Sequence, residues 1–230
     1  MPSWKDDPDR FVLRRDYGGD FVLFLNGILT RPGNQFAWTD RAERWMADHT
    51  SHEYDAIEYF HTPLLGPILG DGRVYREAIK LLEGYRDSAK RAGKPFRVHL
   101  VAHSHGCEIA CRIARDNGIR ITSASLIAAA IPASFERNGL NNAIKRGGLG
   151  RVGVHVSKGD AVLKWLPPMT LGLLYGRLGY EGPDRVDRTV KDRLHVTVRT
   201  DLGHSEWFAP EQFGRTMLSV NQQVGRFRLE

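Results

Sequence analysis

Residues 95–114 constrain the fold of this chain more than any other stretch of its sequence. The first half, which ends at Ala102, is an apolar run typical of a buried strand. In the second half, small and apolar residues recur at steps of three and four, which predicts a helix. Ser104 stands at the junction, with Ala102 two residues before it and Gly106 two residues after it. A sharp strand-to-helix turn leaves room only for small side chains at those two positions, and it pushes the serine hydroxyl clear of the sheet.

Two other interpretations of this turn are open at this point. Ser104 can be a polar helix cap, because serine is a good N-cap residue. His103 and His105 stand two apart on an extended segment, where two imidazoles can share a metal ion. That pattern resembles the start of the H-x-H-x-D-H motif of metallo-β-lactamase-like hydrolases. The chain has Cys107 and Glu108 where that motif needs Asp and His.

Composition places the chain among ordinary globular proteins. Its 230 residues are 41% hydrophobic and 26% charged, enough for a sizeable core, and we expect residues 1–230 to form a single domain. The net charge is +6, but the Lys and Arg residues are scattered and form no run of five. We therefore expect a solvated basic surface and no nucleic-acid partner. The oligomeric state stays open.

Nothing in the sequence points to an oxidising compartment or a membrane. The two cysteines, Cys107 and Cys111, are neighbours on the predicted helix, where a disulfide would be strained, so we expect both to pack in the core. Neither a signal peptide nor a transmembrane segment is visible, and no span reaches 18 apolar residues. The sequence thus predicts a cytoplasmic protein.

Strand and helix patterns alternate along the chain. Strands are predicted at 11–15, 21–25, 54–60, 95–102, 121–131, 151–157 and 194–200. Helices are predicted at 36–49, 74–92, 135–146 and 210–224, together with the helix after Ser104. Turns are expected at 16–20 and in a long loop with Pro and Gly from 63 to 72. Alternation of this kind predicts an α/β fold with a doubly wound, mostly parallel sheet.

In parallel sheets, chemistry gathers just past the carboxyl ends of the strands. Ser104 and Asp160 each follow a predicted strand, and His204 lies in the loop between the last strand and the last helix. The order Ser, Asp, His resembles the α/β-hydrolase superfamily on its lipase and esterase side, over roughly residues 10–225. The resemblance implies that Ser104 is a nucleophile, His204 its general base and Asp160 the carboxylate that orients the base.

The same resemblance implies an oxyanion hole. Asn26 and Gly27 follow a predicted strand at the place of the oxyanion loop, where relatives often have His-Gly. The backbone amides of Ile28 and His105 would be its two donors. Asn in place of His leaves open whether residue 26 only braces the loop.

Each member of this set has a simpler interpretation. Asp160 can merely cap the next helix, and Asp187, Asp192 and Asp201 are rival acids. His99 and His155 lie within strands and are expected to be satisfied core residues. His195 opens a strand and has no obvious route to the site. His103 and His105 can touch a substrate, or His103 can pack under the turn.

The expected activity is hydrolysis of a carboxylic ester through an acyl-enzyme intermediate, without metal or other cofactor, on a small-molecule or lipid-like ester substrate. The alternative is a non-catalytic or altered-chemistry binding protein on the same scaffold. No insertion is long enough for a large cap domain. The apolar segment 161–181, with Trp165, Leu173 and Leu174, either covers the substrate pocket or packs as core.

Overall fold

The computed structural model describes residues 11–27, 38–57, 66–116, 118–169 and 175–225, and for 66–70 and 166–169 it describes the backbone only. Six strands form one sheet in the order β2-β1-β3-β4-β5-β6, and all five neighbouring pairs are parallel. The strands are β1 (Asp20–Leu25), β2 (Glu53–Ile57), β3 (Arg97–His103), β4 (Ile121–Ile127), β5 (Leu149–Ser157) and β6 (Leu194–Arg199). The predicted doubly wound α/β class is confirmed.

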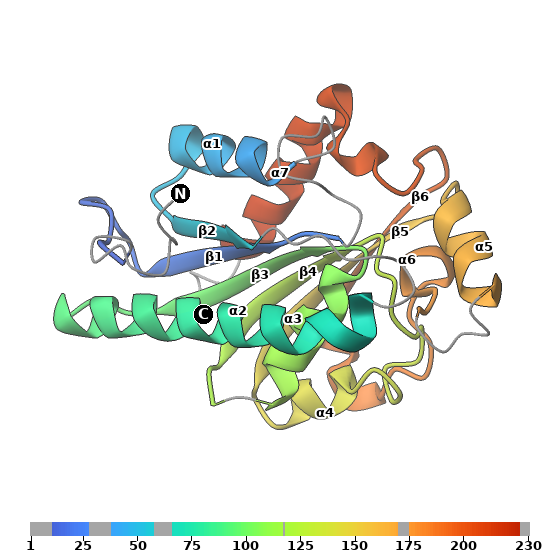
Figure 1. The fold of residues 1–230 in the computed structure, drawn as a ribbon, viewed down its shortest axis with the longest axis horizontal. Helices are drawn as coiled ribbons and strands as arrows, with labels where there is room; N and C mark the ends of the chain where they lie inside the picture. Colours follow the sequence, from blue (N-terminus) through green and yellow to red (C-terminus); the bar gives the residue numbers. More distant parts are fainter. Residues whose placement is uncertain (1–10, 28–37, 58–65, 117, 170–174, 226–230) are drawn as a thin grey trace.

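Helices cover both faces of this sheet (Figure 1). The helices are α1 (Thr39–His49), α2 (Gly66–Arg91), α3 (Gly106–Asp116), α4 (Leu140–Lys145), α5 (Ala161–Met169), α6 (Leu178–Glu181) and α7 (Pro210–Gly225), with short 3₁₀ turns η2 (Arg188–Arg193) and η3 (Glu206–Phe208). Helices α1 and α7 lie on one face, and α2, α3 and α4 lie on the other. All six residues of β1 are buried, as expected for a strand with helices on both sides.

Three of the elements predicted before residue 73 differ from the structure. Residues 11–15 form no strand, because the amide of Arg14 donates to the Glu53 carboxylate (2.7 Å) and its carbonyl closes a turn with Tyr17 (3.0 Å), so these groups are not free for a sheet. The expected hairpin at 16–20 is therefore absent as well. The expected loop at 63–72 is helical from Gly66 onward, since a proline at position 67 falls in the first helical turn, where its missing N–H costs nothing.

Two later elements are shorter than predicted. The strand expected at 121–131 ends at Ile127, because Ala128 takes a left-handed backbone conformation (φ 45°) and the chain turns toward Ser104. The helix expected at 135–146 is confined to α4, which begins after Gly139 at φ 79°. Both cysteines are buried free thiols, as predicted, and burial raises the pKa of each. Across the described ranges, no helix is long and apolar enough to span a bilayer.

Candidate active site

Ser104 occupies the turn between β3 and α3. Its φ of 54° lies in the left-handed region, which non-glycine residues rarely adopt, so its backbone is strained as in nucleophile turns. Three backbone hydrogen bonds hold it there: its amide donates to the carbonyl of Ile127 (3.0 Å), and its carbonyl accepts from the amides of Ala130 (3.1 Å) and Cys107 (3.2 Å). The end of β4 and the loop after it therefore fix the strained residue.

Small residues flank Ser104 for a reason that the structure makes explicit. A β-carbon added to Gly106 would lie 2.5 Å from the carbonyl oxygens of both Leu25 and Asn26. Ala102 is fully buried on the other side of the turn. The predicted crowding of strand and helix at this junction is thus present.

His204 and Asp160 meet Ser104 at the carboxyl edge of the sheet. The Nε2 atom of His204 lies 2.9 Å from the Ser104 hydroxyl oxygen, and its Nδ1 atom lies 2.7 Å from Oδ2 of Asp160. A carboxylate only accepts, so Nδ1 carries the proton and donates it, which leaves the Nε2 lone pair for the serine hydroxyl. The Asp160 side chain is fully buried and that of His204 is 13% exposed. The arrangement can pass a proton from the serine to the imidazole.

Asp160 also caps the helix that follows it. Its Oδ1 atom accepts the backbone N–H of Leu163 (2.8 Å), while Oδ2 accepts from His204. The two interpretations of this residue therefore do not compete, because each oxygen has its own partner.

The loop that carries His204 is held against the end of β5. The Ser157 hydroxyl donates to the carbonyl of Leu202. A β-carbon on Gly159 would lie 2.7 Å from the same oxygen, so only a glycine allows this approach. This contact between the loop and the end of β5 explains how His204, 44 positions after Asp160 in sequence, reaches the Asp160 carboxylate.

The rival carboxylates lie elsewhere. Asp201 is paired with Arg199 (2.6 Å), and Asp187 is paired with Lys145 and accepts from Thr189 (2.8 Å). Asp192 lines a cavity at the opposite edge of the sheet. Of the four candidate acids, the structure brings Asp160 to His204.

The loop after β1 adjoins the serine. A β-carbon on Gly27 would lie 3.0 Å from Cβ of Ser104 and 3.5 Å from its hydroxyl oxygen. Asn26 braces this loop, because its Oδ1 atom accepts from the Gly27 amide (2.7 Å) and from Nε1 of Trp38 (3.0 Å). Ile28, the other predicted amide donor, lies outside the described residues.

His105 has a different partner for its side chain than the sequence suggested. Its Nε2 atom lies 2.9 Å and 3.1 Å from the two carboxylate oxygens of Asp71 on α2, and its ring meets Tyr175 edge to face. Burial and the Asp71 charge raise the pKa of Tyr175 to about 12. Among the described residues, no backbone carbonyl outside the helices and strands accepts from the amide of His105. Sequence reasoning missed Asp71, because it lies in a segment predicted to be a loop.

His103 packs under the turn. Its Nε2 atom lies 3.0 Å from the carbonyl oxygen of His204, and its ring contacts Trp38 and Phe208. Burial, with a smaller contribution from nearby His204, lowers its pKa to about 3. His103 and His105 thus bind different groups, and no three His, Cys, Asp or Glu side chains in the described ranges converge as a metal site would require. This geometry does not match the shared-metal interpretation.

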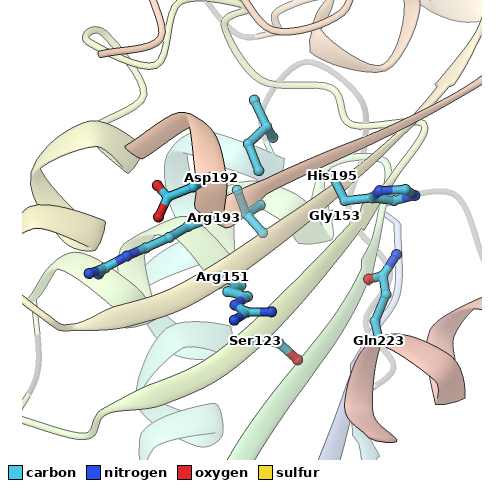
Figure 2. A pocket seen from close by; sticks show the side chains of 9 residues that line it. Ser123, Arg151, Gly153, Asp192, Arg193, His195 and Gln223 are labelled. Atoms are coloured by element: carbon cyan, nitrogen blue, oxygen red, sulfur yellow. The ribbon is translucent and has the colours of Figure 1, made fainter. Parts of the chain in front are cut away.

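The three other histidines that the sequence analysis named lie away from Ser104. His99 contacts Ser123 (2.8 Å) and Asp20 (3.2 Å), and His155 contacts Gln223 (3.4 Å), so both are satisfied core residues as predicted. His195 lines a cavity of about 170 Å³ with Ser123 and Gln223. Figure 2 shows the residues that line this cavity, among them Ser123 of β4, Gly153 of β5 and His195 of β6.

Only part of the proposed pocket segment falls within the described residues. Trp165 on α5 is 63% exposed, and Leu173 and Leu174 lie outside the described residues. Residues 176–179 are packed tightly, since a β-carbon on Gly179 would lie 2.2 Å from the amide nitrogen of Ala129. The end of the segment is therefore structural, whereas the side chain of Trp165 lies at the surface, with the ammonium of Lys164 5.4 Å from its ring centroid.

Solved structures with a similar fold include esterases. The Est2 esterase of Thermogutta terrifontis, solved with propionate, aligns with a TM-score of 0.57 at 12% identity, covering 92% of this chain and 84% of that one. Carboxyl esterase 2 of Tuber melanosporum also gives 0.57 at 12% identity, covering 92% and 79%. An uncharacterised Bacillus cereus protein gives 0.59 at 12% identity, covering 94% of this chain and 61% of that one. The chain therefore has the α/β-hydrolase fold.

Sequence comparison gives a weaker likeness. A protein of Arabidopsis thaliana named probable lysophospholipase BODYGUARD 4 is 28% identical over 149 residues, which are 63% of this chain. The match covers 32% of that relative, so this chain aligns with about a third of its length. No family model matches the chain.

Proposed function

We propose that this chain of α/β-hydrolase fold is a serine esterase that cleaves carboxylic esters. The observation that carries the proposal is the pair of hydrogen bonds that link Ser104 to His204 (2.9 Å) and His204 to Asp160 (2.7 Å). A nucleophile needs a base within this distance, and the base needs a third group to orient it. The strained serine turn adds to the argument, because strain of this kind persists at sites where the hydroxyl must be presented.

In the first half of the reaction, the Ser104 oxygen attacks the ester carbonyl carbon while Nε2 of His204 takes the hydroxyl proton. The tetrahedral intermediate then breaks its bond to the alcohol oxygen, which receives that proton from His204. The products are an acyl group on Ser104 and a free alcohol. Asp160 holds Nδ1–H of His204 throughout and stabilises the transient imidazolium.

In the second half, a water molecule attacks the acyl carbon and gives a proton to Nε2 of His204. The bond to the Ser104 oxygen breaks, the serine recovers its proton, and a carboxylic acid leaves. His204 needs a free Nε2 lone pair at each attack, so it acts as the base once in each half of the reaction.

The oxyanion hole of the proposal uses backbone amides. The His105 amide stands directly after the nucleophile, and Gly27, the residue before Ile28, adjoins the serine hydroxyl. The Oδ1 atom of Asn26 holds the Gly27 amide and itself accepts from Trp38, which supports a fixed backbone up to Gly27.

The proposed substrates are small-molecule or lipid-like esters. The named relatives guide this choice: two similar structures are esterases, and the Arabidopsis relative is named a probable lysophospholipase. Trp165 is the described member of the proposed pocket, since it is apolar, exposed and carried by the helix that Asp160 caps.

The test is a panel of p-nitrophenyl esters from acetate to dodecanoate, assayed with the wild-type chain and with Ser104→Ala. We expect hydrolysis by the wild type and a loss on the order of 10⁴-fold or more in Ser104→Ala, with an unchanged melting temperature. Equal rates for the two proteins would refute the proposal. An inactive wild type that binds esters without turnover would instead support the binding-protein alternative, and chelator-sensitive activity in Ser104→Ala would support a metal-dependent one.

A further inference from the structure

His103 combines complete burial with a single polar contact among the described residues. It is the last residue of β3 and is 4% exposed. Its Nε2 atom lies 3.0 Å from the carbonyl oxygen of His204. Because a carbonyl oxygen can only accept, Nε2 must carry the proton of this bond. The residue before the candidate nucleophile thus donates to the backbone of the candidate base, 101 positions further along the chain.

Aromatic side chains fix the ring of His103. Phe208 in η3 and Trp38 at the start of α1 stack on each other, with ring centroids 4.1 Å apart and planes 9° apart. Both present themselves edge to face to His103, at 5.1 Å and 6.5 Å. Trp38 also donates to Asn26 in the loop after β1. The imidazole is therefore held between the loop of the candidate base and the loop next to the serine.

The surroundings of His103 keep it neutral. Among the described residues, the titratable group against the ring is His204, with ring centroids 4.9 Å apart; Trp38, Phe208 and Gly27 are uncharged. Burial and this neighbour lower the pKa of His103 to about 3. In the neutral ring Nδ1 is a lone-pair acceptor, and it faces the backbone at Gly27, where a β-carbon would lie 3.4 Å away. A neutral donor can hold His204 without opposing the positive charge that His204 gains during catalysis.

His204 is then fixed at both ends. Its ring is held by Asp160 and Ser104, and its peptide carbonyl is held by His103. We propose that His103 is a positioning residue, whose Nε2–H fixes the backbone of His204 and thereby the distance from the imidazole to the Ser104 hydroxyl. This inference rests on the proposed function, since it assigns a role within the same site. It predicts an effect on turnover with little effect on substrate binding, because His103 is covered and does not touch the substrate.

The experiment compares His103→Leu, which removes the donor, with His103→Gln, whose amide can place an N–H near the position of Nε2. A matched control is His155→Leu, the same change at another buried histidine of low pKa, whose ring meets Trp207 edge to face and whose Nε2 atom contacts Gln223. We expect kcat to fall roughly ten- to a hundred-fold in His103→Leu with KM within about twofold, as for a misplaced catalytic group. We expect the kcat of His103→Gln to lie within about fivefold of the wild-type value. We expect His155→Leu to keep the wild-type kcat.

Each outcome decides the inference. Wild-type kcat in a folded His103→Leu would overturn it, and so would a folded His103→Gln as impaired as the leucine variant. If His103→Leu does not fold, the glutamine variant decides the inference by two measurements. These are its kcat and the low-field NMR resonance of the proton between His204 and Asp160, which we expect the glutamine variant to retain. Failure of the proposed function is distinguishable, because it would appear as a wild type that hydrolyses no ester or as a Ser104→Ala variant that hydrolyses esters at the wild-type rate.

Discussion

Each oxygen of the Asp160 carboxylate has its own partner, and the two partners predict different consequences of mutation. Asp160→Asn can keep an acceptor for the Leu163 amide, so the cap on α5 and the fold are expected to survive. The amide NH₂ would then face Nδ1 of His204 and favour the tautomer with a proton on Nε2, which cannot take the serine proton. We expect kcat to fall on the order of 10³-fold or more, measured by ester hydrolysis at saturating substrate.

The control for this variant is Asp201→Asn. Asp201 lies close to His204 in sequence, but it is exposed and paired with Arg199. Its replacement is expected to leave kcat within about threefold. A silent Asp160→Asn alongside an impaired Asp201→Asn would show that the acid has been assigned to the wrong residue.

At the scale of residues, the three members of the candidate triad could be predicted because each stands at a recognisable place in the strand and helix pattern. Their supporting residues could not. Asp71 is 34 positions from His105 and Trp38 is 12 positions from Asn26, and no local pattern links either pair. His103 illustrates the same limit, since the sequence left open whether it touches substrate or packs under the turn.

At the scale of elements, the contact between β1 and α3 depends on Gly106. Gly106→Ala would drive a β-carbon into two backbone carbonyls that cannot rotate away, so strand and helix must separate. We expect a loss of about 1–3 kcal/mol in the free energy of unfolding, measured by urea denaturation, and a loss of esterase activity. Gly118→Ala is the matched control, because nothing lies within 4 Å of a β-carbon at that position. Equal stability of the two variants would contradict the packing at the turn.

Trp165 tests the pocket assigned to α5. It is exposed, so Trp165→Ala is expected to change the melting temperature little. If its side chain contacts the acyl or alcohol part of the substrate, kcat/KM should fall several-fold for decanoate esters and remain near wild type for acetate esters. An equal fall in kcat/KM for esters of every acyl chain length would show that the Trp165 side chain does not line the substrate pocket.

The errors of element prediction also have physical causes. Proline and glycine at 66–72 suggested a loop, yet proline is compatible with a first helical turn, and α2 begins there. The apolar run at 121–131 continues past β4 because residues 128–131 are buried in a turn rather than in a strand. An apolar run indicates that a segment is buried, but only its backbone conformation shows whether the segment is a strand or a turn.

At the scale of the whole molecule, the parallel sheet brings together residues that are 44 and 100 positions apart in sequence. The alternation of strands and helices could predict this sheet and its reactive edge. The alternation could not predict how much burial between the sheet and its loops destabilises the protonated form of a histidine, because that free energy depends on tertiary packing.

Buried neutral histidines make the stability of the molecule depend on pH. Burial, with a smaller effect of His195, lowers the pKa of His155 to about 4, while Gln223 lies 3.4 Å from its Nε2 atom. Between pH 6.5 and pH 4 the unfolded state therefore binds a proton that the folded state does not, so stability falls as the pH falls. A lowering of the His155 pKa from 6.5 to about 4 corresponds to a loss of roughly 3 kcal/mol of stability by about pH 4.

His155→Leu removes this titration. Urea unfolding of both proteins from pH 7.5 down to pH 4 should show that the stability advantage of the wild type over the variant shrinks by roughly 3 kcal/mol. Parallel stability curves for the two proteins would contradict a neutral buried His155.

The central claim is that His204 and Asp160 activate Ser104 as a nucleophile, and covalent trapping tests it most directly. A fluorophosphonate probe reacts with activated serines, and peptide mass spectrometry locates the adduct. We predict one adduct per chain, on Ser104, formed with loss of fluoride. It should be absent in a folded Ser104→Ala and at least 10²-fold slower in His204→Ala. An unlabelled wild type, an adduct on another residue, or undiminished labelling of either variant would contradict the claim.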